Sequence, residues 1–289
     1  MTLEKLKTYF INKISGQYSE TESKTLFGIF VEKYLELNTI QQRTEKQLKL
    51  SAPQTELFRK AIMELKSGKP YQQILGETLF FGMKFYMDEN VLIPRPETEE
   101  LLELAIEEIK KNAVLRADFS VLDIGTGSGI IPIVLKKHFP QAQISALDFS
   151  EKALKTAQKN SDFHQVEINF MHQNYLEENL TEVYDVIISN PPYIGIEEEG
   201  EIAASVKEFE PTMALFSPTS NALVFYEKIA KDCGKNLGAN GMVFLEINQK
   251  LGNETAELFK NVLAEVHLLQ DISGNERMVW GRKQLTVES

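Results

Sequence analysis

Three closely spaced glycines follow an apolar segment in the run Val121-Leu-Asp-Ile-Gly-Thr-Gly-Ser-Gly129. Glycines at such a turn let the chain bend tightly and let a ligand lie against bare peptide groups. A dinucleotide fingerprint would need glycine at position 130, which is Ile130, so the match is G-x-G-x-G and an NAD site is disfavoured. Asp123, just before the loop, would repel a pyrophosphate but would suit a cationic group such as the ammonium of an amino acid.

An acidic residue, Asp148, ends the next predicted strand, 19 residues after Gly129. A carboxylate at this point of a nucleotide-binding α/β unit accepts hydrogen bonds from ribose hydroxyls. A ligand that combines adenosine with an ammonium group is S-adenosyl-L-methionine. The glycine loop and Asp148 together therefore predict a site for this cofactor.

A second group of residues, Asn190-Pro191-Pro192-Tyr193, comes directly after the predicted strand 183–189. Ligands in open α/β sheets bind at the carboxyl ends of strands, so this segment can face the glycine loop. The prolines restrict the backbone. The Asn190 side-chain oxygen and the Pro191 carbonyl can each accept a hydrogen bond from one N–H of a planar –NH2 group. Tyr193 offers a flat face for stacking. Two such acceptors stabilise the partly positive nitrogen that develops as a methyl group arrives, and this chemistry needs no general base.

The elements that must position these residues alternate between strands and helices from about residue 118 onward. The predicted strands are 119–124, 143–148, 166–171, 183–189, 242–247 and two closing strands within 265–282. The predicted helices are 99–111, 128–138, 150–160, 221–237 and 253–263. This rhythm is typical of a doubly wound, mostly parallel α/β sheet.

The first part of the chain has a different pattern. Apolar residues recur every three or four positions within 3–14, 20–35 and 57–65, which predicts helices only. Aromatic and β-branched runs on either side of Asp88-Glu89-Asn90 then predict a β-hairpin. We therefore expect a helical domain at 1–75, a β-hairpin linker at 76–94 and an α/β domain at 95–289. The helical domain either packs only on its neighbour or recognises a macromolecular partner.

The composition is that of a folded globular protein, with 289 residues of which 43% are hydrophobic and 25% charged. A net charge of −11 disfavours broad nucleic-acid binding, which needs a cationic surface. Cys233 is the only cysteine, and the four histidines lack zinc-ligand spacing. The N-terminus is too charged for a signal peptide, and no apolar run approaches 18 residues. We expect a cytoplasmic, metal-independent monomer that contacts neither membrane nor nucleic acid.

These motifs together resemble the PrmC/HemK family of peptide chain release factor glutamine methyltransferases, which are class I S-adenosylmethionine-dependent methyltransferases. The resemblance covers nearly the whole chain and includes three further segments: Ile93-Pro-Arg-Pro-Glu-Thr-Glu99, Phe209-Glu-Pro211 and Gly274-Asn-Glu-Arg277. Asn-Pro-Pro-Tyr alone is shared with DNA and RNA adenine methyltransferases, so the combination makes the resemblance specific. It implies a Rossmann-like methyltransferase domain with a small all-helical N-terminal domain.

The resemblance also implies a role for each motif residue. The methionine end of the cofactor would lie against the loop residues Gly125, Thr126, Gly127, Ser128 and Gly129. Asp148 would hold the ribose and Tyr175 would flank the adenine, next to Asn174, which stands where the family usually has Asp. Asn190 would bind both cofactor and substrate, and Pro191, Pro192 and Tyr193 would complete the catalytic pocket.

The substrate that the resemblance implies is the glutamine in the Gly-Gly-Gln motif of release factors. Methylation of its side-chain nitrogen, N5, would modulate translation termination, and the helical domain would dock the release factor. The main alternative is an N6-adenine methyltransferase on DNA or RNA, which would need a basic cleft and a route for base flipping. A non-enzymatic binding protein is disfavoured by the complete Asn190–Tyr193 motif, and an NAD-dependent oxidoreductase by Ile130 and Asp123.

Overall fold

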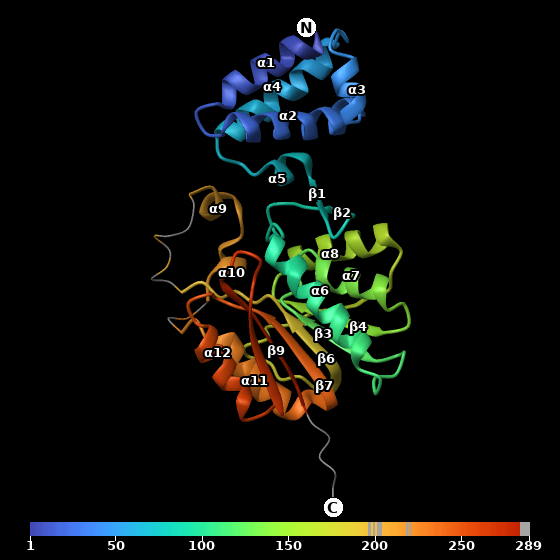
Figure 1. Cartoon of the computed structure of the whole chain (residues 1–289), viewed down its shortest axis with the longest axis vertical. Coiled ribbons are helices and arrows are strands. Elements are labelled where there is room, and N and C mark those ends of the chain that lie inside the picture. Colours follow the sequence, from blue (N-terminus) through green and yellow to red (C-terminus); the bar gives the residue numbers. More distant parts are fainter. Residues whose placement is uncertain (196–197, 199, 201–203, 218, 220, 284–289) are drawn as a thin grey trace, which may run out of the picture. The chain divides into compact units, whose positions relative to one another are not determined.

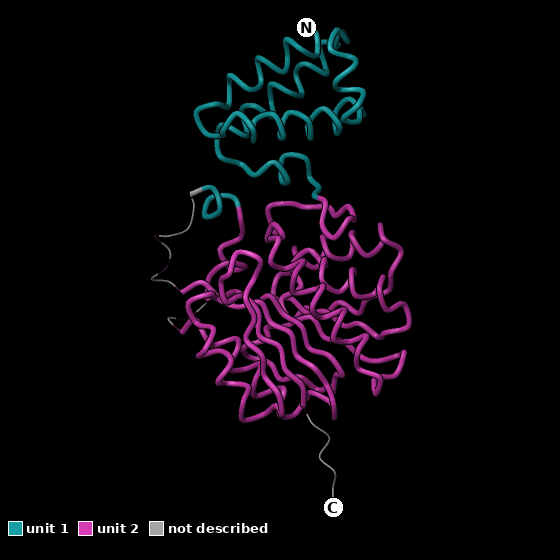
Figure 2. The backbone as a smooth tube through the Cα atoms, viewed as in Figure 1, with its two compact units in different colours: residues 1–78, 204–209 teal, residues 79–203, 210–289 magenta. Residues whose placement is uncertain are grey.

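The computed structural model describes residues 1–195, 198, 200, 204–217, 219 and 221–283. The chain forms two compact units, which Figure 2 colours separately. The first unit contains residues 1–78 and 204–209, and the second contains residues 79–203 and 210–289. The first unit is therefore assembled from two segments that lie far apart in the sequence.

The first unit is a small bundle of helices around an aromatic core. Its helices are α1 (Leu3–Ile14), α2 (Glu20–Leu35), α3 (Thr39–Thr44), α4 (Ala52–Lys66), α5 (Tyr71–Leu75) and α9 (Ala204–Phe209). Ser19 and Ser51 begin α2 and α4 by accepting a hydrogen bond from the third residue of each helix, which satisfies an N–H that has no partner within the helix. Phe10, Phe30 and Phe58 come from three different helices and are fully buried.

Helix α9 belongs to this bundle although it lies about 130 residues beyond α5 in the sequence. The side-chain amide of Gln73 donates a hydrogen bond of 2.7 Å to the backbone carbonyl of Phe209. Gln73 is itself 9% exposed, so this bond is largely shielded from water. The contact joins α5 to the end of α9.

A two-stranded sheet follows the bundle, formed by β1 (Glu77–Phe80) and β2 (Met83–Tyr86). The predicted hairpin exists, but its predicted turn at Asp88-Glu89-Asn90 is wrong. The chain turns at Phe81 and Gly82, which have φ of 51° and 70°, the left-handed region in which glycine is favoured. Asp88 instead accepts a hydrogen bond from the N–H of Asn90 in a local loop, and the residues after it form no strand.

The second unit is built on a seven-stranded sheet with the order β5-β4-β3-β6-β7-β9-β8. Its strands are β3 (Ser120–Ile124), β4 (Gln143–Asp148), β5 (Asn169–His172), β6 (Tyr184–Ser189), β7 (Leu237–Glu246), β8 (Glu265–Gln270) and β9 (Glu276–Arg282). The pairs among β5, β4, β3, β6 and β7 are parallel, and β9 runs antiparallel to both β7 and β8. The expected doubly wound, mostly parallel α/β fold is confirmed.

Helices cover both faces of this sheet, as Figure 1 shows. One face packs against α6 (Pro96–Lys111), α7 (Ile130–His138) and α8 (Glu151–His164). The other packs against α11 (Val224–Asn236) and α12 (Gly252–Lys260), and the short α10 (Thr212–Leu215) lies in the loop before α11. Alternate residues of each central strand contribute to the two cores: Val186 and Ile188 face the first set of helices, and Ile187 faces the second.

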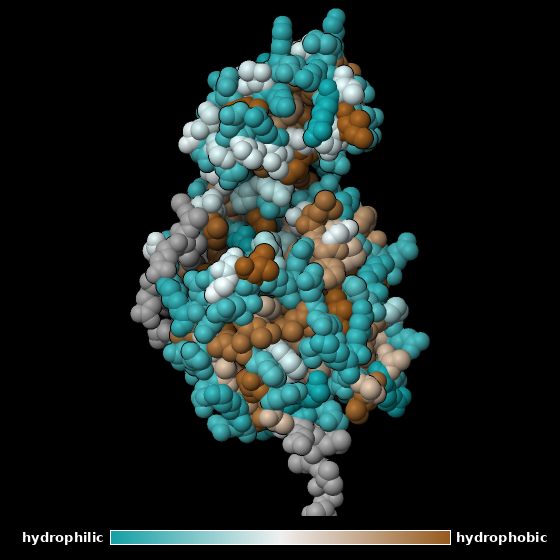
Figure 3. Space-filling view, in the orientation of Figure 1, coloured by the Kyte–Doolittle hydropathy of each residue, from teal (hydrophilic) through white to brown (hydrophobic). Residues whose placement is uncertain are grey.

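The surface is mainly hydrophilic on the face drawn in Figure 3, with separate apolar patches. Ile272, Leu79 and Ile40 are the most exposed large apolar side chains that the structure describes. Within the described ranges, no helix combines the length and apolar character needed to cross a membrane. The same part of the chain shows no cluster of three or more side chains that could ligate a metal ion.

Candidate functional site

The motif residues meet at the carboxyl ends of three inner strands of the seven-stranded sheet. The glycine loop leaves the carboxyl end of β3, Asp148 ends β4, and Asn190 follows β6. Strand β3 lies between β4 and β6, so the chain connections diverge to opposite sides of it. Such a switch point leaves a crevice outside the strand ends, where α/β proteins bind their ligands.

The glycine loop requires glycine for two different reasons. Gly125, Gly127 and Gly129 have φ of 76°, 54° and 78°, all in the left-handed region. A Cβ on Gly129 would come within 3.0 Å of the Cβ of Ala157, so the loop packs directly on α8 there. A Cβ on Gly125 or Gly127 would meet no atom within 4 Å. The first two glycines thus expose bare backbone toward open space, where a ligand can approach.

Asp148 connects the end of β4 to this loop. Its Oδ2 accepts a hydrogen bond of 2.8 Å from the N–H of Gly127, and its Oδ1 accepts one of 2.8 Å from the N–H of Ser150. Burial raises the pKa of this carboxyl group, and the two backbone donors oppose that rise. Each oxygen has a second lone pair, so the carboxylate can still accept hydrogen bonds from a ligand.

Asp123 is a buried carboxyl group beside the same loop. It is 0% exposed, and neither of its oxygens forms a hydrogen bond of ordinary geometry with a described residue. Burial raises its pKa to about 7, against a smaller lowering effect of the neighbouring Thr126 hydroxyl. The Thr126 hydroxyl is also buried and has no such partner in the described part of the chain. These orphaned groups fit a polar, positively charged ligand group arriving at the loop.

Asn190 is held by a short chain of hydrogen bonds. Its Nδ2 donates to the hydroxyl of Thr98 at 3.2 Å, and that hydroxyl donates to Oε2 of Glu246 at 2.7 Å. Thr98 lies in the first turn of α6 and Glu246 at the end of β7, so three elements converge on this point. No described residue donates a hydrogen bond to Oδ1 of Asn190.

Tyr193 is tied to the same carboxylate. Its hydroxyl lies 3.3 Å from Oε1 of Glu246, and its backbone carbonyl accepts a hydrogen bond of 3.1 Å from the side chain of Asn248. Burial and the nearby Glu246 raise the pKa of the Tyr193 hydroxyl, so it remains a neutral donor. Pro191 and Pro192 have trans peptide bonds and connect Asn190 to Tyr193 in a loop without regular structure.

Two further motif segments meet beside this loop. The buried side chain of Glu210 accepts a hydrogen bond of 3.0 Å from the N–H of Ile93 and one of 2.6 Å from the Arg95 guanidinium. The Ile93–Glu99 segment is thereby fixed to Glu210. Arg95 therefore acts as the partner of a buried carboxylate within the fold.

Tyr175, which the resemblance places at the adenine, lies mainly in the core. It is 3% exposed, its hydroxyl donates a hydrogen bond of 2.8 Å to Asp232, and its ring stacks on Phe225 at 6.5 Å. Its side chain thus packs with α11 rather than with the glycine loop. Its contact with the cofactor stays a prediction.

Sequence reasoning missed the roles of Thr98 and Glu246. Thr98 was visible only as part of a motif, and Glu246 only as an acidic residue at the end of a buried apolar strand. That position is a usable signal, because Asp123 and Asp148 also lie at or next to the carboxyl ends of parallel strands in the same sheet. The contact between Thr98 and Glu246 joins residues 148 positions apart, so no local pattern reveals it.

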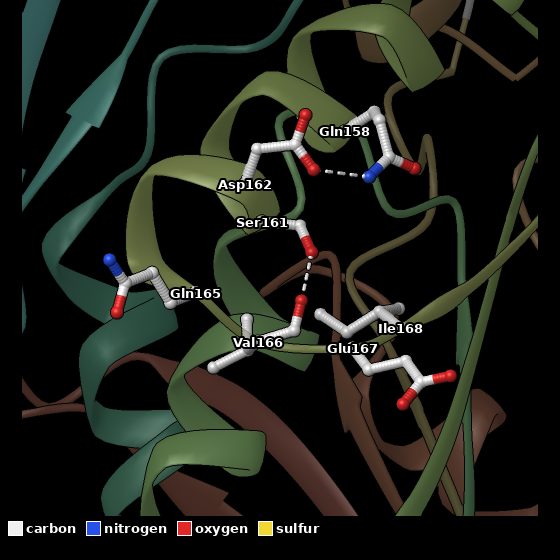
Figure 4. Close-up of a pocket in the computed structure, with 7 residues that line it drawn as sticks. All are labelled: Gln158, Ser161, Asp162, Gln165, Val166, Glu167 and Ile168. Atoms are coloured by element: carbon white, nitrogen blue, oxygen red, sulfur yellow. Dashed lines mark hydrogen bonds between the residues drawn. The ribbon is translucent and has the colours of Figure 1, made fainter.

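A surface depression lies away from these strand ends, beside the segment that precedes the start of β5 (Figure 4). Three of its five polar side chains are engaged: Gln158 donates to Asp162, and Ser161 donates to the carbonyl of Val166. It contains none of the motif residues. We therefore place the candidate site at the carboxyl ends of β3, β4 and β6.

Comparisons with known proteins give the family and the fold of the chain. The model of the methyltransferase small domain family matches residues 102–208. A release factor glutamine methyltransferase from Flavobacterium psychrophilum is 43% identical over 96% of this chain and 98% of its own length. One of the same name from Bacteroides thetaiotaomicron is 34% identical over 96% of this chain and 99% of its own length.

Solved structures show the same fold at low identity. A methyltransferase from Pyrococcus furiosus is 17% identical and superposes with a TM-score of 0.51, over 71% of this chain and 91% of that chain. A 16S rRNA methyltransferase from T. thermophilus, solved with AdoMet and guanosine, is 16% identical and superposes with a TM-score of 0.51. The match covers 72% of this chain and 50% of that chain. The second unit therefore has the class I methyltransferase fold.

Proposed function

This chain belongs to the family of release factor glutamine methyltransferases, and we propose that it methylates the side-chain nitrogen, N5, of the glutamine in the Gly-Gly-Gln motif of release factors. The proposal is supported by relatives that match nearly the whole chain, helical unit included. The single structural observation that carries it is the side-chain oxygen of Asn190, which accepts no hydrogen bond from a described residue and can accept one from a substrate amide.

S-adenosyl-L-methionine is the cofactor, and the residues present fit it. Gly125 and Gly127 leave open space against bare backbone. The carboxyl group of Asp123 is buried without a hydrogen bond of ordinary geometry to a described residue, and it suits a nearby ammonium group. Asp148 keeps lone pairs for ribose hydroxyls while it braces the loop through Gly127. Gly129 instead packs against Ala157 of α8, which allows the loop to lie close to that helix.

The acceptor amide is held by the loop after β6. When bound, the cofactor supplies a methyl group on a positively charged sulfur, open to displacement by a nitrogen lone pair. An amide nitrogen is a weak nucleophile because its lone pair is delocalised. Oδ1 of Asn190 and the carbonyl of Pro191 would accept hydrogen bonds from its two N–H groups and stabilise the positive charge that develops on it. The methylated nitrogen then loses one proton to solvent. Pro192 and Tyr193 would complete the pocket, with Tyr193 held in place by Glu246.

The helical unit would recognise the release factor away from the reaction itself. The chain would act in the cytoplasm, since its substrate works in translation termination, and we propose that it does so as a monomer. Neither a membrane nor a nucleic acid is part of this proposal. An adenine substrate is disfavoured because the relatives found are named for glutamine and the net charge is −11.

The test is a methyl-transfer assay with labelled S-adenosyl-L-methionine and three acceptors: a purified release factor, its Gln→Ala variant in the Gly-Gly-Gln motif, and duplex DNA. Label on the wild-type factor alone supports the proposal and identifies the glutamine. Label on DNA alone would establish the adenine alternative. Equal labelling of the wild-type and Gln→Ala factors would contradict the assigned acceptor.

A further inference from the structure

We infer that Thr98 and Glu246 are positioning residues that fix the orientation of the Asn190 side-chain amide. They would keep its –NH2 group turned inward, so that its carbonyl oxygen is left for the substrate. The inference rests on the proposed function of Asn190. It adds two buried residues that lie outside the Asn190–Tyr193 motif.

The choice between the two orientations matters because an asparagine side chain is nearly symmetrical in shape. Its oxygen only accepts hydrogen bonds and its nitrogen only donates them, so a flipped amide would present donors to the –NH2 group of a glutamine. Two donors facing each other repel. The loop can therefore hold the substrate only if the inward contact of Asn190 uses its nitrogen.

The Thr98 hydroxyl alone would not settle this choice, because a hydroxyl can both donate and accept. It has a single proton, however, and Oε2 of Glu246 lies only 2.7 Å away. An ionised carboxylate accepts only, so the Thr98 proton points to Glu246. The oxygen of Thr98 then has only lone pairs to offer Asn190, and Nδ2 of Asn190 donates to it at 3.2 Å.

Burial makes this chain of hydrogen bonds resistant to competition from water. Thr98 is 5% exposed and Glu246 1% exposed. The other oxygen of Glu246 receives the Tyr193 hydroxyl, so one carboxylate orders both ends of the Asn190–Tyr193 loop. Other charged or titratable groups around Glu246 are Arg277 on β9, Glu97 on α6 and Tyr226 on α11, whose hydroxyl lies 3.2 Å from the Glu246 backbone carbonyl.

Glu246 must be ionised for this direction to be imposed. Burial raises its pKa to about 7, while the Thr98 and Tyr193 hydroxyls and Arg277 act in the opposite sense. Experiments are therefore best made at pH 8. There the carboxylate form predominates and the direction of the hydrogen bonds is fixed.

The decisive comparison is Thr98→Val against Thr98→Ser. Valine has nearly the same shape but no hydroxyl, whereas serine retains it. We expect Thr98→Val to lower turnover by roughly 10–100-fold, as small losses of alignment do, with the affinity for S-adenosyl-L-methionine reduced no more than in Asn190→Ala. Thr98→Ser should keep turnover close to that of the wild type. Thr255→Val is the matched control, because Thr255 is fully buried in α12 and its hydroxyl has no partner among the described residues.

A second variant guards against misfolding of the first. Glu246→Gln is almost isosteric, but its amide can donate to Thr98 and release the Thr98 proton toward Asn190. We expect it to lower turnover like Thr98→Val, and the double variant to be no worse than either single one, because all three break the same chain. Equal loss in Thr98→Val and Thr98→Ser, or normal turnover in Thr98→Val, would overturn the inference.

A spectroscopic readout separates this inference from the proposed function. The side-chain amide signals of Asn190 can be assigned in ¹⁵N-labelled, cofactor-free protein by their absence in Asn190→Ala. Their chemical shifts should change in Thr98→Val and Glu246→Gln, and in Thr98→Ser they should be close to those of the wild type. Unchanged signals in Thr98→Val would contradict the hydrogen bond even if turnover fell. A wild-type enzyme that failed to label a release factor would reject the proposed function and leave this measurement decisive.

Discussion

The carboxylate of Asp148 and the backbone of Gly127 are joined by a hydrogen bond of 2.8 Å across the ends of β4 and β3. The residue predicted to hold the cofactor ribose therefore also fixes the loop predicted to hold the methionine end. Cofactor binding and loop shape should respond together when this residue is changed.

Asp148→Asn should weaken binding of S-adenosyl-L-methionine by roughly 10–100-fold. The –NH2 group of the new asparagine must face the N–H of Gly127 or of Ser150, so one of these hydrogen bonds is lost, and the other no longer has a charged acceptor. Isothermal titration calorimetry measures the affinity directly. Asp162→Asn, which changes an exposed aspartate on α8, should bind like the wild type. Unaltered affinity in Asp148→Asn would remove Asp148 from the cofactor site.

Two glycine variants should separate folding from binding. Gly129→Ala combines a left-handed backbone with a Cβ 3.0 Å from Ala157, so we expect a loss of about 2–4 kcal/mol of stability in urea denaturation. Gly125→Ala carries only the backbone cost, about 1–2 kcal/mol, yet places its Cβ where the cofactor would lie. It should therefore lose cofactor binding while staying folded. Equal stability losses in both variants would contradict the different surroundings of the two glycines.

The buried Asp123 should make stability fall as pH rises. Its pKa is about 7 in the folded protein against an ordinary value of 3.8, so between these values the folded state binds more protons than the unfolded state. The free energy of unfolding of the cofactor-free protein should therefore decrease across that window, by at most about 1.4 kcal/mol per pH unit from this group.

Asp123→Asn has no such titration, so its stability relative to the wild type should improve by up to about 4 kcal/mol between pH 4 and pH 8. Urea denaturation at several pH values measures this difference. Asp118→Asn, at an exposed aspartate just before β3, is the control and should show no such gain. A constant difference between Asp123→Asn and the wild type would mean that Asp123 is ionised throughout.

Asn190→Ala should reduce methyl transfer by roughly 10²-fold or more, as the loss of one preorganised polar group does. Cofactor affinity should be weakened but remain measurable, since the glycine loop and Asp148 are unchanged. Single-turnover assays at saturating cofactor isolate the transfer step. Near-normal rates would exclude a role of Asn190 in holding the acceptor amide.

The regular part of the second unit was predictable because its signals are local. The strand at 143–148 was predicted with the bounds that the structure has, and Ser150 begins α8 as its side chain suggested. Three of the five parallel strands, β3, β4 and β7, lie between helices of ordinary length, and such alternation admits few arrangements. The motif residues then had to meet at the carboxyl edge of the sheet.

The features that were not predicted depend on contacts between distant residues or on very short elements. Helices α3, α5, α9 and α10 have four to six residues each, too few for an amphipathic period. The hairpin turn was misplaced because Asp88-Glu89-Asn90 looks more turn-like than Phe81-Gly82, whose backbone is left-handed. The link from Asn190 through Thr98 to Glu246 requires three separate elements to come together.

The origin of the helical unit from two separate segments limits how relatives can be recombined. Exchanging residues 1–78 alone between two homologous genes would leave the native α9 opposite a foreign α5. The bond from Gln73 to the carbonyl of Phe209 would then depend on whether the incoming sequence also supplies an amide at that position. A correctly folded chimera is therefore expected only when residues 204–209 are exchanged together with residues 1–78, which are two separate stretches of the gene.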